Sequence, residues 1–184
     1  KQIIGLVAAV ILMVVVSVID YVWIANFYWI LYILSVGMLA IVLIPGVGEV
    51  VNGARRWINL GFTNFQPSEL AKIFLIIFFA KFIMVHEEDL SSKRTILKAV
   101  ILIVIPLVLL FEEPNLSTTI CTAALFCVLM YVGGLSYRFI GIVLLVTVPT
   151  AIILLSLIVQ PDQKILDDYQ QKRILAWLNP EEYA

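Results

Sequence analysis

Hydrophobic residues occur in long runs separated by short polar segments, rather than alternating with polar residues at every second position. Six runs reach roughly 17 residues or more, about the length that an α-helix needs to cross a bilayer. The predicted spans are residues 3–19, 27–45, 70–86, 95–111, 116–132 and 139–159. The pattern therefore predicts an all-α fold, a polytopic transmembrane helical bundle, because strands of a membrane barrel would be short and alternating.

Composition places the chain in the same class. Hydrophobic residues make up 62% of the 184 positions and charged residues 14%, with a mean hydropathy of +1.07. These values lie outside the range of soluble domains. The formal net charge of −1 provides no basic field for nucleic acid, so we expect no nucleic-acid partner. Because Lys1 is not an initiator methionine and Ala184 ends no evident element, residues 1–184 are interpreted as a single partial transmembrane domain of a larger protein.

Three polar segments are expected to share one side of the membrane. Consecutive connections between spans alternate sides, so this group contains the outer loop 46–69, the turn 112–117 and the tail from residue 160 to residue 184. Basic residues divide almost evenly between the two sides, so they do not assign the cytoplasmic face. Basic residues retained on the side of the long loop suggest that an anionic ligand binds there.

Residues 53–72 contain most of the candidate functional side chains. Pro67, Ser68 and Glu69 form a helix start, because proline presets φ, serine can satisfy free backbone donors and a carboxylate complements the helix dipole. Glu69 and Lys72 are three residues apart and can pair on one helical face. Charged groups at membrane depth are candidates for function. The alternative for this pair is a structural ion pair that locks helices together.

Two arginines beside a tryptophan suit an anionic headgroup at a membrane interface. The guanidinium groups of Arg55 and Arg56 can bind phosphate oxygens, while the Trp57 indole lies at headgroup level. The alternative for Trp57 is simple anchoring at the interface. An interfacial belt is also predicted from the aromatic residues at the first connection, namely Tyr21, Trp23, Tyr28, Trp29 and Tyr32.

The cysteines and the histidine give weaker indications of function. Cys121 and Cys127 lie in an apolar run on different helical faces, so they are interpreted as packing residues rather than a disulfide. His86 is interpreted as a solvated loop histidine. The sequence shows no cluster of metal ligands; the cofactor stays unknown, although a divalent cation is compatible with the chain. Residues 169–178 are predicted to form a short amphipathic helix on the membrane surface.

Several motifs together resemble one family. Gly-Ala-Arg-Arg-Trp-Ile at 53–58, Phe-Gln-Pro-Ser-Glu-Leu-Ala-Lys at 65–72, Tyr-Gln-x-x-Arg-Ile at 169–174 and the Asn-Pro pair at 179–180 are similar to SEDS proteins of the RodA/FtsW/SpoVE type. That resemblance covers essentially the whole chain. It implies a ten-span fold, of which this chain would supply the second to seventh spans and the start of a large outer loop.

The resemblance also implies an activity. SEDS proteins are peptidoglycan glycosyltransferases of bacterial cell-wall synthesis, which polymerise lipid II, an undecaprenyl-diphosphate-linked disaccharide, on the outer face of the cytoplasmic membrane. A carboxylate deprotonates the attacking sugar hydroxyl, and cations stabilise the departing diphosphate. By this reading Arg56, Lys72 and Arg173 contact the diphosphate, Glu69 orients Lys72, and Arg55 is a weaker candidate. The implied partners are lipid II, membrane lipid and a class B penicillin-binding protein.

The chain departs from the family pattern at two places. The catalytic acidic residue of the family follows the Asn/Asp-Pro pair, and here it is expected just beyond Ala184. The turn at 113–118 reads Glu-Pro-Asn-Leu-Ser-Thr, where the family commonly has Gln-Pro-Asp-x-Gly-Thr, so a carboxylate is lost at position 115 while Glu112 and Glu113 leave negative charge nearby. Three functions stay open: a glycosyltransferase, a lipid II flippase or transporter, and a non-catalytic membrane scaffold.

Overall fold

The computed structural model describes residues 2–51, 54–59, 61, 64–136, 141 and 145. Helices dominate the described chain, which confirms the helical prediction. Their bounds are α1 Gln2–Val18, α2 Tyr21–Asn26, α3 Tyr28–Leu43, α4 Pro67–Val85, α5 Lys93–Glu112 and α6 Leu116–Val132. Apart from residues 141 and 145, the predicted span 139–159 lies outside the described residues, as do the tail 160–184, the amphipathic segment 169–178 and Arg173.

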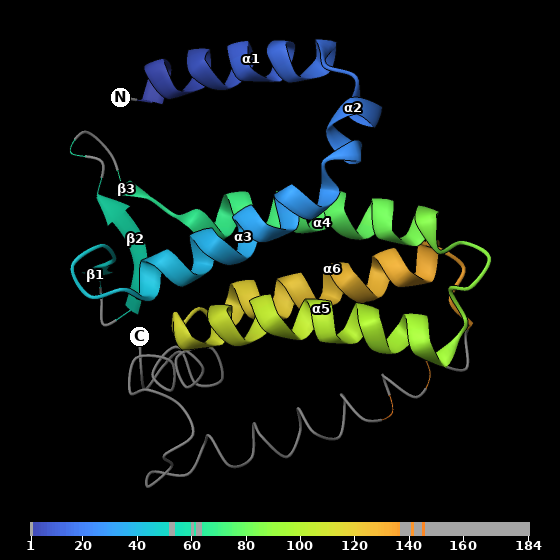
Figure 1. Cartoon of the computed structure of the whole chain (residues 1–184). Coiled ribbons are helices and arrows are strands. Elements are labelled where there is room, and N and C mark those ends of the chain that lie inside the picture. Colours follow the sequence, from blue (N-terminus) through green and yellow to red (C-terminus); the bar gives the residue numbers. More distant parts are fainter. Residues whose placement is uncertain are drawn as a thin grey trace, which may run out of the picture.

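Helices α3 to α6 lie side by side as a bundle, whereas α1 runs apart from it and is joined through the short α2 (Figure 1). Most of the side chains of α1 that the structure describes are largely exposed, including Leu12 and Val18. An apolar helix whose described side chains are mostly exposed suits a lipid environment. Within the described residues, α5 alone is both long and apolar enough for a full membrane crossing; α1, α3 and α6 are apolar but shorter. The number of spans therefore stays a prediction.

The core of the bundle is aromatic. Phe78 of α4 contacts Tyr32 of α3 with ring centroids 4.6 Å apart, and Phe79 contacts Phe126 of α6 at 4.9 Å. Tyr32 is only 7% exposed, and its hydroxyl donates a hydrogen bond to the Leu102 carbonyl of α5 at 2.9 Å. Such ring contacts add to burial. The interpretation of Tyr32 as an interfacial anchor was therefore wrong, because its ring and hydroxyl join three helices.

A small sheet corrects the all-α description. The segment between α3 and α4 forms β1 Glu49–Val51, β2 Ala54–Asn59 and β3 Asn64–Phe65, paired antiparallel in the order β1-β2-β3. Ile58 pairs with Phe65 across β2 and β3. The sheet covers the end of the bundle where α3 ends and α4 begins (Figure 1). The basic stretch is thus held on a strand instead of a free loop.

Candidate functional site

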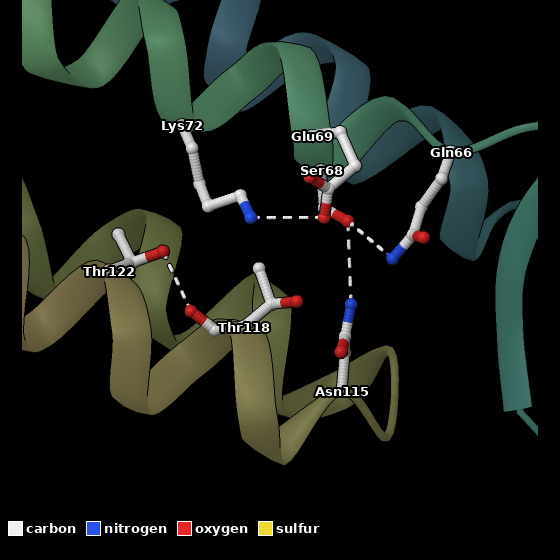
Figure 2. A network of polar contacts seen from close by, with 7 residues as sticks. All are labelled: Gln66, Ser68, Glu69, Lys72, Asn115, Thr118 and Thr122. Carbon is white, nitrogen blue, oxygen red and sulfur yellow. Dashed lines mark hydrogen bonds and ion pairs between the residues drawn. The ribbon is translucent and has the colours of Figure 1, made fainter.

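The start of α4 places a carboxylate and an ammonium at the end of the bundle that the sheet covers. Pro67 occupies the first turn, and Lys72 Nζ donates to Glu69 Oε1 at 3.0 Å (Figure 2). The Lys72 side chain is 20% exposed and the Glu69 side chain 58%, so water screens the pair, which contributes about 0.2–1 kcal/mol at most. Both partners lie on α4, so this ion pair does not lock two helices together.

Glu69 and Lys72 line an open cavity of about 480 Å³ between α4 and α6. Ile73 and Ile76 of α4 and Leu125 of α6 supply an aliphatic wall. Lys72 also borders a narrower crevice that runs deeper between α4, α5 and α6. The cavity thus combines a charged mouth with an apolar wall, which suits a ligand with a polar head and an apolar tail.

The two arginines of β2 have different surroundings. Arg55 Nη1 donates to the Leu43 carbonyl at 3.2 Å, and so satisfies a free acceptor at the last residue of α3. Gly48 makes room for this side chain, since a Cβ there would lie 2.7 Å from Arg55 Cγ. Arg56 follows on the strand and is also partly buried. Adjacent strand residues point to opposite faces, so Arg55 supports the fold while Arg56 is directed elsewhere.

Glu113 is a candidate site residue that the sequence indicated only as negative charge near the turn. It lies in the turn between α5 and α6, is 0% exposed, and neither of its carboxylate oxygens has a hydrogen-bond partner among the described residues. Burial raises the pKa of Glu113 from 4.5 to about 8, against the opposing effect of the positive charge of Arg56. The signal available in the sequence was the pair of glutamates before Pro114, which indicated charge at the turn but not its burial.

Ser68 joins this turn to the start of α4. Its hydroxyl oxygen accepts hydrogen bonds from Gln66 Nε2 at 3.0 Å and from Asn115 Nδ2 at 3.4 Å (Figure 2). Ser68 and Asn115 are both buried. The expected role of Ser68 in satisfying backbone donors is thus replaced by a bridge between side chains. Thr122 donates locally to the Thr118 carbonyl at 2.8 Å on the facing surface of α6.

The structure gathers part of the predicted site. Arg56 on β2 and Lys72 on α4 belong to elements at the same end of the bundle (Figure 1). The turn between α5 and α6 is joined to this end of the bundle by the hydrogen bond from Asn115 to Ser68, and the charge of Arg56 acts on its Glu113. Arg173 lies outside the described residues. Within the described ranges, no group of three or more His, Cys, Asp or Glu residues is arranged to hold a metal ion.

Comparison with known proteins gives consistent matches. A family model for FtsW, RodA and SpoVE, described as "Cell cycle protein", matches residues 1–184. The chain is 37% identical over 154 residues to the probable peptidoglycan glycosyltransferase FtsW of Nitrosomonas europaea, a match covering 81% of the chain and 37% of that protein. It is 32% identical over 153 residues to the peptidoglycan glycosyltransferase MrdB of Escherichia coli K12, covering 83% and 39%.

Solved structures agree with these relatives. One chain comes from a peptidoglycan synthase complex studied for the coordination of polymerization and crosslinking; it matches with a TM-score of 0.72 and 30% identity, over 98% of this chain and 50% of that one. The crystal structure of Thermus thermophilus rod shape determining protein RodA matches with a TM-score of 0.67 and 28% identity, over 79% and 47%. The chain therefore spans half or less of each of these proteins.

Proposed function

Because the chain belongs to the FtsW/RodA/SpoVE family, we propose that the full-length protein is a peptidoglycan glycosyltransferase that polymerises lipid II into glycan strands during bacterial cell-wall synthesis. The relatives from Nitrosomonas europaea and Escherichia coli carry the name of this activity. The observation that carries the proposal in this chain is the cavity between α4 and α6, with Lys72 at its mouth and aliphatic residues along its wall.

An undecaprenyl diphosphate needs both parts of such a cavity. The Lys72 ammonium attracts the phosphates, and Ile73 and Ile76 on the same helix provide apolar surface for the first isoprene units. Arg56 adds a second positive charge at the same end of the bundle, and Arg173 is proposed as a third. The guanidinium of Arg56 suits phosphate oxygens because its donors form a planar fork.

The proposed chemistry separates binding from proton transfer. Lys72 and Arg56 stabilise the negative charge that develops on the departing diphosphate, which is their contribution to the transition state. Glu69 orients the Lys72 ammonium through the 3.0 Å ion pair. A carboxylate expected beyond Ala184 takes the proton from the attacking sugar hydroxyl. In this proposal the residues of this chain hold the leaving group, and the base comes from the following outer loop.

We further propose a location and a partner. The full-length protein would be a multi-pass protein of the bacterial cytoplasmic membrane, with the sheet-covered end of the bundle facing outward. Its partner would be a class B penicillin-binding protein, which crosslinks the glycan strands that the glycosyltransferase makes. The match to a chain from a synthase complex that coordinates polymerization and crosslinking supports this partnership.

The test uses full-length protein reconstituted in proteoliposomes with lipid II, with polymer length and rate as readouts. Lys72→Ala should lower the polymerisation rate about 100-fold, the loss expected when one preorganised charge contact to a developing anion is removed. Lys98→Ala is the matched control, because Lys98 is exposed on α5, near the opposite end of the bundle. A Lys72→Ala rate equal to that of the Lys98 variant would contradict the proposed site.

The same vesicles separate enzyme from transporter and scaffold. A transporter would move lipid II between leaflets without forming polymer, and a scaffold would do neither in the absence of partner enzymes. Polymer formed by the purified protein and lost on Lys72→Ala supports the glycosyltransferase. Lipid movement without polymer in the unaltered protein would favour the transporter instead.

A further inference from the structure

A second cavity, of about 250 Å³, lies between α2 and α4, apart from the α4–α6 cavity that Lys72 borders. The cavity is formed by α2, which precedes the first residue of α3, and by the second half of α4, so it lies in the half of the bundle away from the sheet (Figure 1). The proposed catalytic site makes no use of it. Its wall is apolar, and most of the described wall consists of Val22, Ile24, Ala25, Ile77, Ala80 and Met84.

Lys81 is the one charged group among the described residues that line this cavity. Its side chain is partly buried, and no carboxylate of a described residue lies within ion-pair distance of its ammonium. Asp20, at the start of α2, accepts a hydrogen bond from the Val22 N–H, and the acidic residues of the loop after α4 are exposed. An ammonium without a counter-ion beside an apolar wall is costly in a membrane helix, so it is a candidate for binding an anion.

Lys81 and Lys72 are too far apart to bind the same phosphate group. They are nine positions apart on α4, about two and a half helical turns, so they lie on opposite faces of the helix. The same spacing separates them by roughly 14 Å along the helix axis. Ile76 is the one described residue that lines both cavities. The cavity at Lys81 is therefore distinct from the proposed lipid II site.

The position of Lys81 along α4 suits a phosphate at the membrane interface. The helix ends at Val85, four residues later, which is about 6 Å along the axis. A lysine stem lies along apolar surface while its ammonium reaches the headgroup region. Tyr21, exposed at the start of α2, also lines the cavity, and its hydroxyl is a second group able to donate to a phosphate oxygen.

The size and the charge of the cavity indicate its occupant. Its volume is below the range of about 300–1,000 Å³ that is typical of sites for drug-sized ligands, so it has room for part of an acyl chain rather than for a sugar head group. One cation without a carboxylate is balanced by a ligand with one net negative charge. Phosphatidylglycerol has that charge, whereas the phosphate of phosphatidylcholine is cancelled by its own ammonium group.

We propose that the cavity between α2 and α4 binds an anionic phospholipid of the phosphatidylglycerol type, with its phosphate at the Lys81 ammonium and the first part of one acyl chain against the apolar wall. This inference goes beyond the proposed glycosyltransferase activity and does not depend on it. Only the choice of leaflet rests on the proposed orientation, which places this end of the bundle in the cytoplasmic leaflet. The bound lipid neutralises Lys81 and fills the space between the two helices.

The test titrates the full-length protein in detergent with phosphatidylglycerol or phosphatidylcholine of matched acyl chains, and native mass spectrometry counts the bound lipids. We expect one phosphatidylglycerol to bind about tenfold more tightly than phosphatidylcholine, the factor that one charged contact provides. Lys81→Gln should remove this preference. Lys98→Gln is the matched control and should keep it, because Lys98 is an exposed cation on α5 at the same end of the bundle. A preference retained in Lys81→Gln, or lost equally in Lys98→Gln, overturns the proposal.

Two further variants separate this site from other occupants. Ala80→Phe fills the cavity without a change of charge and should weaken the binding of both lipids; unchanged binding overturns the placement of the acyl chain. Lys72→Ala should lower polymerisation but keep the preference for phosphatidylglycerol, so the two proposals fail separately. A preference lost in Lys72→Ala would assign the lipid to the α4–α6 cavity and overturn this site. If the unaltered protein retains neither lipid, another part of the full-length chain covers the cavity and the proposal is wrong.

Discussion

The two ends of the bundle formed by α3, α4 and α6 contain different kinds of buried side chain, aromatic at one end and polar at the other. Around Phe78, rings from α3, α4 and α6 pack together, and the hydroxyl of the buried Tyr32 has its acceptor. At the start of α4, the same degree of burial encloses Ser68, Asn115 and Glu113, and the carboxyl group of Glu113 has no donor among the described residues. A region in which the buried polar groups have hydrogen-bond partners is typical of a structural core. A buried ionisable group without such a partner is a candidate for function.

The largest expected effect concerns the aromatic core. Phe78→Ala removes a fully buried ring that contacts residues of α3 and α4, and it should lower the free energy of unfolding by about 3–5 kcal/mol. Thermal unfolding in detergent would measure this loss. Leu97→Ala on α5, where the side chain is largely exposed, is the control and should change stability little. Equal losses in both variants would remove the distinction between core and periphery.

The next prediction concerns the dependence of the free energy of unfolding on pH, which comes from Glu113 at the polar end of the bundle. The pKa of Glu113 is raised in the folded state from 4.5 to about 8, so the folded state binds a proton that the unfolded state releases above pH 4.5. Its contribution to stability is present in full below about pH 4.5 and is lost as the pH rises through about 8, at up to about 1.4 kcal/mol per pH unit. Unfolding between pH 6 and 9 measures the slope.

The matched variants isolate the source of that slope. Glu113→Gln should flatten the dependence of stability on pH, because a glutamine does not titrate, while Glu112→Gln should keep it. If the slope survived in Glu113→Gln, another group would be responsible and the contrast between the two ends of the bundle would lose its electrostatic part.

The smallest expected effect concerns the bridge between α4 and the turn. Ser68→Ala removes the acceptor of hydrogen bonds from Gln66 and Asn115 and should cost about 1 kcal/mol of stability. Ser117→Ala on the exposed side of α6 is the control. We also expect Ser68→Ala to reduce lipid II polymerisation, since the turn that carries Glu113 would be held less firmly. A stability loss with unchanged polymerisation would make the bridge purely structural.

Much of the site was predictable because its parts are local. The i, i+3 spacing alone indicated the pairing of Glu69 with Lys72, and Pro67 indicated where α4 begins. The sheet was missed because its strands lie in a short polar segment without a long alternating pattern. Glu113 was undervalued because the charge of a side chain can be read from a sequence, whereas its distance from water cannot.

The sequence by itself determined the long helices α1, α3, α4, α5 and α6 and their order, although not the short α2, since an apolar run of helical length has few other ways to satisfy its backbone in an apolar environment. It also predicted which residues could bind an anion, and that stays a prediction. Only the tertiary structure decided how these residues are used: Arg55 satisfies the last carbonyl of α3, Arg56 acts on Glu113, and Tyr32 joins three helices. The physical reason is that periodicity and capping act within a few residues, whereas burial and electrostatic coupling depend on segments that only folding brings together.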